Sequence, residues 1–435
     1  MGFLLMYSNY ESQFNVIYPE SNNATYLSLM NYSDDLNKPF QRWYRYKEGF
    51  SIDLVKELIR TYNKNPNGII FDPFMGSGST LLGASDMGLD SIGFEVNPFS
   101  YFLASCKLTK YDKETNNDFK IAFEDILNKS FNSTQVFPLP GLSISSKVFD
   151  GNIENYYMGF KHLIMDYPEN NPNVKKLLKL GWLSCLENIS NYRKAGNGLK
   201  KRKYVKPRIL TIQDVYTSLQ KQYINMYDDM ISNTIKANTT IYNESCKNMR
   251  NRIDESSISG IIFSPPYANC FDYTEIYKLE LWFGDFVKEY ADLKLLRKKS
   301  LRSHLNGDLS INEEEIKSNS LLSSLISEVE KKDLWDKRIP NMLRLYFNDM
   351  FCVLEDCYRV LENKGFCSII VGNSAYGGVI IPTDLILAQY ASNLGFKVDK
   401  IEVDRYIITS SQQYETTKEN KKYLRESLIC LKKEI

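Results

Sequence analysis

A short motif near the middle of the chain could bind a flat ring that carries an amino group: Ser264-Pro265-Pro266-Tyr267. It follows the apolar run at 261–263, which predicts a buried strand ending at the carboxyl edge of a sheet, where α/β enzymes carry their active sites. Two consecutive prolines fix φ and donate no backbone hydrogen bonds, so the turn is stiff. It therefore presents a hydroxyl, free carbonyls and an aromatic ring at nearly one point.

A second segment has the pattern of a strand, a glycine turn and a helix. Residues 68–80 read GIIFDPFMGSGST, and Gly76 and Gly78 allow the backbone to approach a ligand closely. The helix predicted from Ser79 offers unpaired N–H groups at its start. About 20 residues beyond the first strand, a second short strand ends at Glu95, where an acid is placed to bind ribose hydroxyls.

The elements around these two motifs alternate between helix and strand. Leu54 and Leu58 have helical spacing just ahead of the glycine turn, with Ser51 as the expected N-cap. In the second half, the pattern predicts a helix over 343–361, a buried parallel strand over 366–373, and antiparallel strands over 401–408 and 426–432. The fold class is therefore α/β with a mostly parallel sheet.

Composition limits the remaining possibilities. The 435 residues and 43% hydrophobic content can bury a large core, in roughly two or three domains or one elaborated domain. The net charge of +1 means that any nucleic-acid contact depends on local patches. Eight cysteines without a Cys-x-x-Cys pair and only two histidines disfavour metal catalysis and a disulfide framework. We see no membrane-length apolar run or signal peptide, so we expect a cytoplasmic protein.

Asn-rich turns, prolines and helical stretches near 153–165 and 212–236 predict a mainly helical insertion. Residues 191–208 contain many bases and no acid. A charge run is usually a solvated face, but neutralising phosphates supplies much of nucleic-acid affinity, so contact with DNA is the alternative. A second basic stretch follows the tetrapeptide. The candidate DNA contacts are Arg193, Lys194, Lys200, Lys201, Arg202, Lys203, Lys298 and Lys299.

Together, the glycine segment and the tetrapeptide resemble the S-adenosylmethionine-dependent DNA amino-methyltransferases, which modify the exocyclic nitrogen of cytosine or adenine. The family's cofactor loop, Asp-Pro-Phe-x-Gly-Ser-Gly-Ser/Thr-Thr, is matched at 72–80, and its catalytic tetrapeptide is matched in full. The resemblance implies a Rossmann-like methyltransferase sheet. It also implies that S-adenosylmethionine is bound by Phe50, Ser51, Asp72, Pro73, Phe74, Gly76, Ser77, Gly78, Ser79, Thr80, Glu95, Val96, Glu244 and Ser245. A solvated loop acid remains an alternative for Glu244.

The resemblance also divides the chain into segments. We expect an irregular arm over 1–34, a cofactor-binding half over 35–112, a helical insertion for DNA recognition over 113–235, and a catalytic half over 236–435. The last segment would carry an inserted loop over about 285–340. Double-stranded DNA is the implied partner, with a cognate restriction endonuclease acting separately; neither a membrane nor a metal is expected.

The implied chemistry is direct methyl transfer. Ser264 and the Pro265 carbonyl would accept the two amino hydrogens, while Tyr267 would stack on a base flipped out of the duplex. In the family, Ser at the first position goes mostly with N4 of cytosine, whereas Asp or Asn goes mostly with N6 of adenine. We therefore expect an N4-cytosine enzyme and keep adenine N6 as an alternative.

Three other readings stay open. A nuclease fused to a methylase would need an Asp…Glu-x-Lys metal site, and residues 328–331 offer only a single spacing match inside a helical charge run. A methyltransferase acting on guanine N2 of tRNA or on protein glutamine would keep the fold, although those enzymes carry Asp or Asn before Pro-Pro-Tyr. A noncatalytic DNA-binding protein with a decayed cofactor fold belongs to a different class. Intact Asp72, Gly76, Gly78 and Ser264 argue against decay.

Overall fold

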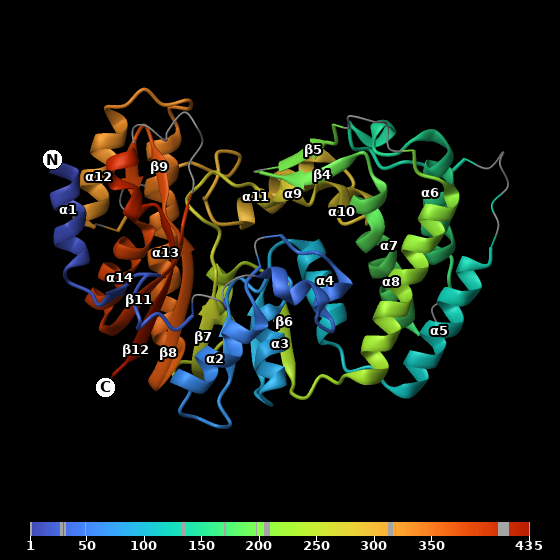
Figure 1. Ribbon diagram of the computed structural model, residues 1–435, viewed down its shortest axis with the longest axis horizontal. Coiled ribbons are helices and arrows are strands. Elements are labelled where there is room, and N and C mark those ends of the chain that lie inside the picture. The colour runs from blue at the N-terminus through green and yellow to red at the C-terminus, as the bar shows by residue number, and fades with distance from the viewer. Residues whose placement is uncertain are drawn as a thin grey trace.

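The computed structural model describes residues 2–26, 29, 32–47, 49–129, 131, 136–168, 171–196, 198–203, 209–311, 316–317, 319–407 and 417–434. Its centre is an eight-stranded sheet with the order β1-β11-β12-β8-β7-β2-β3-β6 (Figure 1). The strands are β1 (Val16–Ile17), β2 (Ile70–Asp72), β3 (Ser91–Phe94), β6 (Thr239–Tyr242), β7 (Ile258–Phe263), β8 (Leu361–Gly372), β11 (Phe396–Tyr406) and β12 (Arg425–Lys433).

The sheet is mostly parallel. Strands β6, β3, β2, β7 and β8 run in one direction, and β12 lies antiparallel between β8 and β11. This is the expected α/β, Rossmann-like class with antiparallel pairing near the C-terminus. The register places Phe71 beside Ile261, so the ends of β2 and β7 lie at the same edge of the sheet.

Helices cover both faces of the sheet because its central strands are apolar on both sides. Ile262 packs in the cluster under α2 (Ile52–Tyr62), whereas Ile261 and Phe263 pack on the opposite side, under α13 (Ile339–Val360). This alternation is the period of two that a strand imposes. The sheet is also bordered by α3 (Ser79–Asp86), α4 (Pro98–Leu108) and α14 (Thr383–Leu394).

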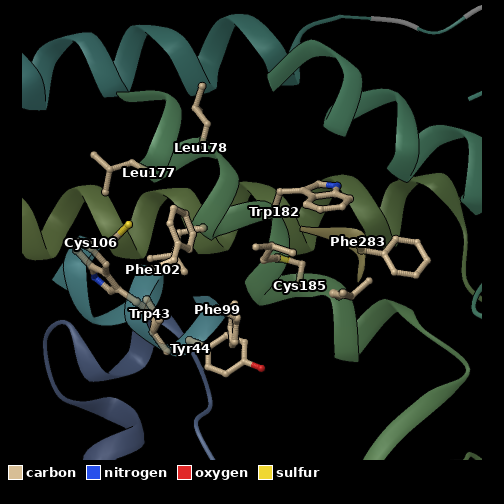
Figure 2. Packing of buried hydrophobic residues seen from close by; sticks show 14 of the residues in the cluster. Trp43, Tyr44, Phe99, Phe102, Cys106, Leu177, Leu178, Trp182, Cys185 and Phe283 are labelled. Carbon is tan, nitrogen blue, oxygen red and sulfur yellow. The ribbon is translucent and has the colours of Figure 1, made fainter. Parts of the chain in front are cut away.

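A second group of helices lies beside the sheet, toward the right of Figure 1. It contains α5 (Lys113–Leu127), α6 (Gly151–Met165), α7 (Pro172–Ile189) and α8 (Ile212–Ser232), with the hairpin β4 (Tyr192–Ala195) and β5 (Gly198–Lys201). The apolar core of these helices continues into α4 and the segment around Trp43 (Figure 2). The helical part and the cofactor half of the sheet therefore share one core.

Two regions differ from the expectations. Residues 1–34 were predicted to be irregular, but α1 (Gly2–Glu11) is a helix, and β1 pairs with β11. Tertiary contact outweighs the weak local pattern, since Tyr7 is buried and its hydroxyl donates to the carbonyl of Ile380 at 2.9 Å. The predicted loop at about 285–340 carries α11 (Tyr290–Lys299) and α12 (Ser320–Glu330), and burial of the apolar face of α12 explains its order.

The remaining described elements are short. Between β7 and α11 lie α9 (Tyr273–Ile276) and α10 (Lys278–Phe283), and β9 (Ser374–Tyr376) pairs with β10 (Val379–Ile381). The 3₁₀ helices are η1 (Tyr32–Asn37), η2 (Gln41–Trp43), η3 (Ser145–Lys147), η4 (Cys246–Asn251) and η6 (Lys418–Tyr423).

Candidate active site

One cavity lies at the carboxyl ends of β2, β3, β6 and β7 and joins the two sequence motifs. The predicted site residues that line it are Phe50, Pro73, Phe74, Gly76, Ser77, Ser79, Glu95, Val96, Glu244, Ser245, Ser264, Pro266 and Lys299. Strand pairing explains the convergence, because parallel strands bring their carboxyl ends to one edge. Residues far apart in the sequence thus face one space.

The glycine turn lies between a strand and a helix, as the sequence pattern predicts. Gly76 has φ +50° and Gly78 has φ +84°, both in the left-handed region that favours glycine. Gly78 is the N-cap of α3, so the free N–H groups of that helix start at the turn. A Cβ at Gly76 would lie 3.2 Å from the ring of Tyr46, which also lines the cavity. The turn therefore needs glycine for both conformation and space.

Two acids shape this end of the cavity. The backbone N–H of Phe74 donates to Asp72 Oδ1 at 2.8 Å, and Asp72 is almost fully buried beneath the turn. Glu95 lines the cavity and accepts from the N–H groups of Gly76 at 3.0 Å and Asn97 at 2.7 Å. Burial raises the pKa of each acid to about 7. Asp72 thus supports the turn, whereas Glu95 faces the ligand space.

A buried lysine that the sequence did not single out is hydrogen-bonded to the glycine turn. Lys107 Nζ on α4 donates to the carbonyl of Ser77 at 2.8 Å and to Gln41 Oε1, and Gln41 Nε2 donates to Ser79 Oγ at 2.9 Å. Lys107 and Gln41 are both buried, and burial lowers the pKa of Lys107 to about 7. Because these residues meet only through tertiary packing, no local sequence signal could have found them.

The tetrapeptide at 264–267 is divided between the cavity and the sheet. Ser264 and Pro266 line the cavity, and Pro265 is buried. Ser264 Oγ donates to Tyr267 Oη at 3.3 Å, and Tyr267 Oη donates to Glu426 Oε1 on β12 at 2.7 Å. Tyr267 was predicted to stack on a base, but it is not among the residues that line this cavity.

A second wall of the cavity was missed by the sequence patterns. It consists of Asp272, Tyr273, Thr274, Leu296, Ser300, Leu301, Ser303 and His304. Asp272 Oδ2 accepts from Arg297 Nε at 2.9 Å and from Asn306 Nδ2 at 2.9 Å, which ties α9 to α11 and the segment after it. The sequence of this wall carries no motif that indicates a site.

The other predicted cofactor contacts lie at the border of the cavity. Ser51 is the N-cap of α2, as predicted, and its buried hydroxyl donates to Asp35 Oδ1 at 2.9 Å. Glu244 forms an ion pair with Arg252 while still lining the cavity. Thr80 Oγ1 donates to the carbonyl of Ile262 at 3.1 Å, which joins the start of α3 to β7.

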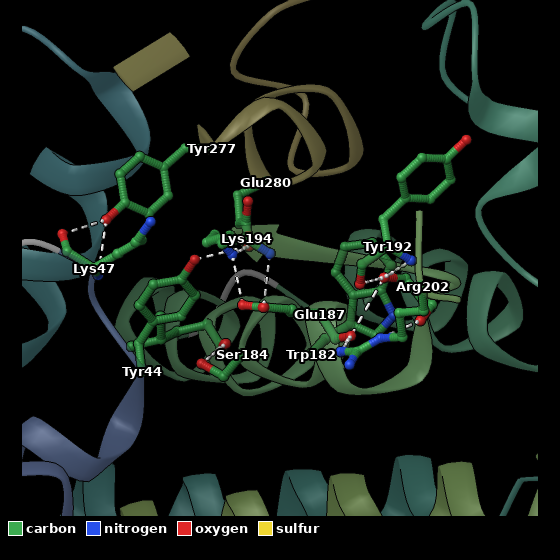
Figure 3. Close-up of polar contacts among 12 residues, drawn as sticks. Tyr44, Lys47, Trp182, Ser184, Glu187, Tyr192, Lys194, Arg202, Tyr277 and Glu280 are labelled. Carbon is green, nitrogen blue, oxygen red and sulfur yellow. Dashed lines mark hydrogen bonds and ion pairs between the residues drawn. The ribbon is translucent and has the colours of Figure 1, made fainter. Parts of the chain in front are cut away.

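The predicted DNA contacts on the hairpin fall into two groups. The first group is exposed and consists of Arg193, Lys200, Lys201 and Lys203. Lys298 on α11 is exposed as well. Residues 204–208 lie outside the described part of the chain. Lys194 differs from the prediction of a DNA contact, because its side chain is only 4% exposed. It pairs with Glu280 at 2.6 Å and with Glu187 at 3.1 Å (Figure 3).

Arg202 also has a structural role. It donates to the carbonyls of Glu187 at 2.9 Å and Ser190 at 3.3 Å, which fastens the hairpin to the end of α7 (Figure 3). Carboxylates bind Lys194, and carbonyls at a helix end bind Arg202. The run of bases in the sequence does not distinguish these two residues from the exposed ones. Lys194 and Arg202 therefore fix the hairpin, and its remaining bases face solvent.

Comparisons with known proteins agree with this arrangement. A DNA methylase family model matches residues 13–104. The type II methyltransferase M.AvaI of Nostoc sp. is 31% identical over 86% of this chain and 83% of its own length. The type II methyltransferase M.BsoBI of Geobacillus stearothermophilus is 28% identical over 86% of this chain and 82% of its own. Among solved structures, the rRNA methyltransferase aviRa of Streptomyces viridochromogenes has 8% identity over 93% of each chain and a TM-score of 0.28, which adds nothing to the assignment.

A Rossmann-like sheet that brings a left-handed glycine turn beside a Ser-Pro-Pro-Tyr strand end defines an amino-methyltransferase. The chain belongs to the N4/N6 family of DNA methyltransferases, because its identity to M.AvaI extends over most of both chains. This confirms the resemblance drawn from the two motifs. The cofactor of this family is S-adenosylmethionine. A nucleoside with a charged tail fits a cavity that offers a glycine turn, a carboxylate and the ring of Phe50.

Two features are absent from the described part of the chain. No group of three or more His, Cys, Asp or Glu side chains within it could hold a metal ion. No helix in the same ranges is both long and apolar enough to span a bilayer.

The contacts of Lys107 predict a specific defect. Lys107→Met would leave the Ser77 carbonyl and Gln41 Oε1 without their donor, at a cost of about 1–3 kcal/mol each. We expect the dissociation constant for S-adenosylmethionine, measured by calorimetry, to rise about tenfold. Lys110→Met, an exposed position just beyond α4, is the control. Equal affinities for the two variants would show that the glycine turn does not depend on Lys107.

Proposed function

We propose that this DNA methyltransferase is site-specific and transfers a methyl group to the exocyclic N4 of a flipped cytosine. The observation that carries the proposal is Ser264, the first residue of the tetrapeptide, which lies in the same cavity as the glycine turn. In the family that residue is mostly Ser when the target is cytosine. Methylation of adenine N6 is the alternative.

The residues of the tetrapeptide would act by orientation. The lone pair of an exocyclic amino group is delocalised into the ring, so the amino nitrogen is a poor nucleophile. Ser264 Oγ and the Pro265 carbonyl would accept the two amino hydrogens, which favours a tetrahedral nitrogen and directs its lone pair. S-adenosylmethionine supplies an electrophilic methyl group on a sulfonium. The new nitrogen–carbon bond would form as the sulfonium–methyl bond breaks, and the nitrogen would lose one of its two hydrogens as a proton. Since no covalent enzyme intermediate is needed, the rate enhancement would come mainly from proximity and alignment.

The opposite end of the cavity would bind the cofactor. The left-handed turn at Gly76 and Gly78 and the start of α3 would hold the methionine part. Glu95 would accept hydrogen bonds from the ribose hydroxyls, and Glu244 would meet the adenine amino group. Both acids line the cavity, which supports these assignments.

The β4–β5 hairpin and the helices α5–α8 would recognise DNA. Lys47 Nζ donates to the carbonyl of Gly196 at the tip of the hairpin, at 2.8 Å. Because Lys47 follows Tyr46, which lines the cavity, the tip of the hairpin lies near the cavity. Exposed bases at this position can neutralise the phosphates that flank a flipped base. We also propose that the enzyme is the modification half of a restriction system, because the relatives bear the name type II methyltransferase.

The direct test of the proposal is to incubate the purified protein with plasmid DNA and S-adenosylmethionine and identify methylated nucleosides by mass spectrometry. We expect N4-methylcytosine. N6-methyladenine would keep the mechanism and show that Ser264 does not set the base. If DNA stays unmodified while the protein binds it, a noncatalytic DNA-binding role would replace the proposal, and methylated tRNA would point to an RNA substrate.

The exposed bases of the hairpin lead to a prediction about DNA affinity. Replacing Lys200, Lys201 and Lys203 together by Ala should weaken DNA binding and lower the slope of log affinity against log salt by about 2–3, because each phosphate contact contributes about 0.9. Lys194 and Arg202 stay intact, so the hairpin remains attached. The control replaces the exposed Lys64, Lys331 and Lys397. An unchanged slope in the hairpin variant would assign these bases to a solvated face.

The pKa of Glu95 leads to a prediction about pH. Burial holds this pKa near 7 in the free protein, and ribose hydroxyls that donate to the carboxylate would favour its ionised form. Cofactor binding should therefore release a proton below about pH 7, and affinity should rise with pH up to about 7 and then level off. Calorimetry in two buffers of different ionisation enthalpy measures this release. Glu95→Gln cannot ionise and should abolish the release; proton release that survives in that variant would point to another group.

A further inference from the structure

The tyrosine of the catalytic tetrapeptide is fixed by strands that follow it by more than 100 residues. Its hydroxyl donates to Glu426 Oε1 at 2.7 Å at the start of β12. Its ring lies against Gly372 at the end of β8, where a Cβ would come within 2.8 Å of the ring. Glu426 Oε2 in turn pairs with Arg405 Nε of β11 at 2.6 Å. Three strands thus determine where the hydroxyl of Tyr267 points.

The direction of each hydrogen bond in this chain follows from the chemistry of the groups. An ionised carboxylate accepts and cannot donate, and Glu426 forms an ion pair with Arg405. Burial and the charge of Glu426 raise the pKa of Tyr267 well above its usual range, so its hydroxyl keeps its proton and donates it. The oxygen of Tyr267 is then free to accept the hydroxyl hydrogen of Ser264, at 3.3 Å.

The consequence concerns the oxygen of Ser264. A serine hydroxyl has one hydrogen and two lone pairs. With its hydrogen directed at Tyr267, Ser264 presents only lone pairs to the cavity and can accept an amino hydrogen. In the opposite orientation its hydrogen would point to the amino nitrogen and compete for the lone pair that must attack the methyl group. The rotation of a single hydroxyl therefore separates a productive arrangement from an inhibitory one.

We propose that Glu426 is a positioning residue, which acts through the hydroxyl of Tyr267 to hold Ser264 as a hydrogen-bond acceptor toward the target amino group. The inference rests on the proposed function, since it assigns to Ser264 the acceptor role. Glu426 lies outside both motifs, more than 150 residues after the tetrapeptide, and its carboxylate acts on the reacting group only through two hydroxyls.

The test combines Tyr267→Phe, Glu426→Leu and Glu426→Gln with steady-state kinetics on plasmid DNA. Tyr267→Phe keeps the ring and removes the hydroxyl, and Glu426→Leu removes the acceptor. We expect each to lower kcat about tenfold, as loss of one oriented hydrogen bond implies, with the cofactor dissociation constant unchanged. The amide oxygen of Glu426→Gln can still accept from Tyr267, so this variant should keep most of kcat.

The decisive measurement is the double variant Tyr267→Phe with Glu426→Leu. If Glu426 acts through Tyr267, the double variant should lose no more activity than either single variant. The proposal would be overturned if the kcat losses of the two single variants multiplied in the double variant. It would also be overturned if Glu426→Leu lowered cofactor affinity as much as kcat. Arg405 is largely exposed, so it stays solvated when Glu426 is replaced. Thermal melts of all variants check that they fold.

Ser264→Ala separates failure of this inference from failure of the proposed function. If the wild-type protein methylates DNA and Ser264→Ala abolishes turnover while Glu426→Leu retains full kcat, the function stands and the positioning role fails. If the wild-type protein modifies no DNA base, or Ser264→Ala retains turnover, the proposed role of Ser264 fails first.

Discussion

The pairing of β2 with β7 is the constraint on which the site depends. These strands are about 190 residues apart in the chain, yet parallel register puts Phe71 beside Ile261 and brings the glycine turn to the tetrapeptide. The hydroxyl of Thr80, at the start of α3, donates to the carbonyl of Ile262 at 3.1 Å and secures the two ends side by side. Parallel strands need a crossover connection, so the long intervening chain can extend away from the sheet without disturbing this contact.

The intervening chain uses that freedom but does not form an independent core. The apolar cluster of α5–α8 includes residues of α4 and of the segment around Trp43, which also borders the glycine turn. Lys194, held by Glu280 and Glu187, and Arg202, held by helix-end carbonyls, fasten the hairpin to the same body. The exposed bases are thus presented from a support that is fastened to the body of the protein, as the proposed contacts with DNA phosphates would require.

Sequence reasoning reached the parts of the molecule that local rules control. The strand end at Phe263, the N-cap at Ser51 and the order of strand, glycine turn and helix around Gly76 all depend on neighbours within a few residues, and the structure has them as predicted. It failed where distant packing decides. The helix α1 forms although its local pattern is weak, and nothing near Lys194 in the chain reveals that Glu280 neutralises it.

The residues that sequence reasoning missed have a common physical property. Lys107 and Glu426 each place an ionisable group where it acts through a hydrogen bond on a motif residue, Lys107 on the Ser77 carbonyl and Glu426 on the Tyr267 hydroxyl. Burying a cation such as Lys107, or holding a carboxylate among packed strands, costs free energy unless hydrogen bonds or ions compensate it. A fold that retains such groups beside two motifs gains directed hydrogen bonds there. Under the proposed function the motifs would supply the reacting atoms, and these distant groups would determine how those atoms are oriented.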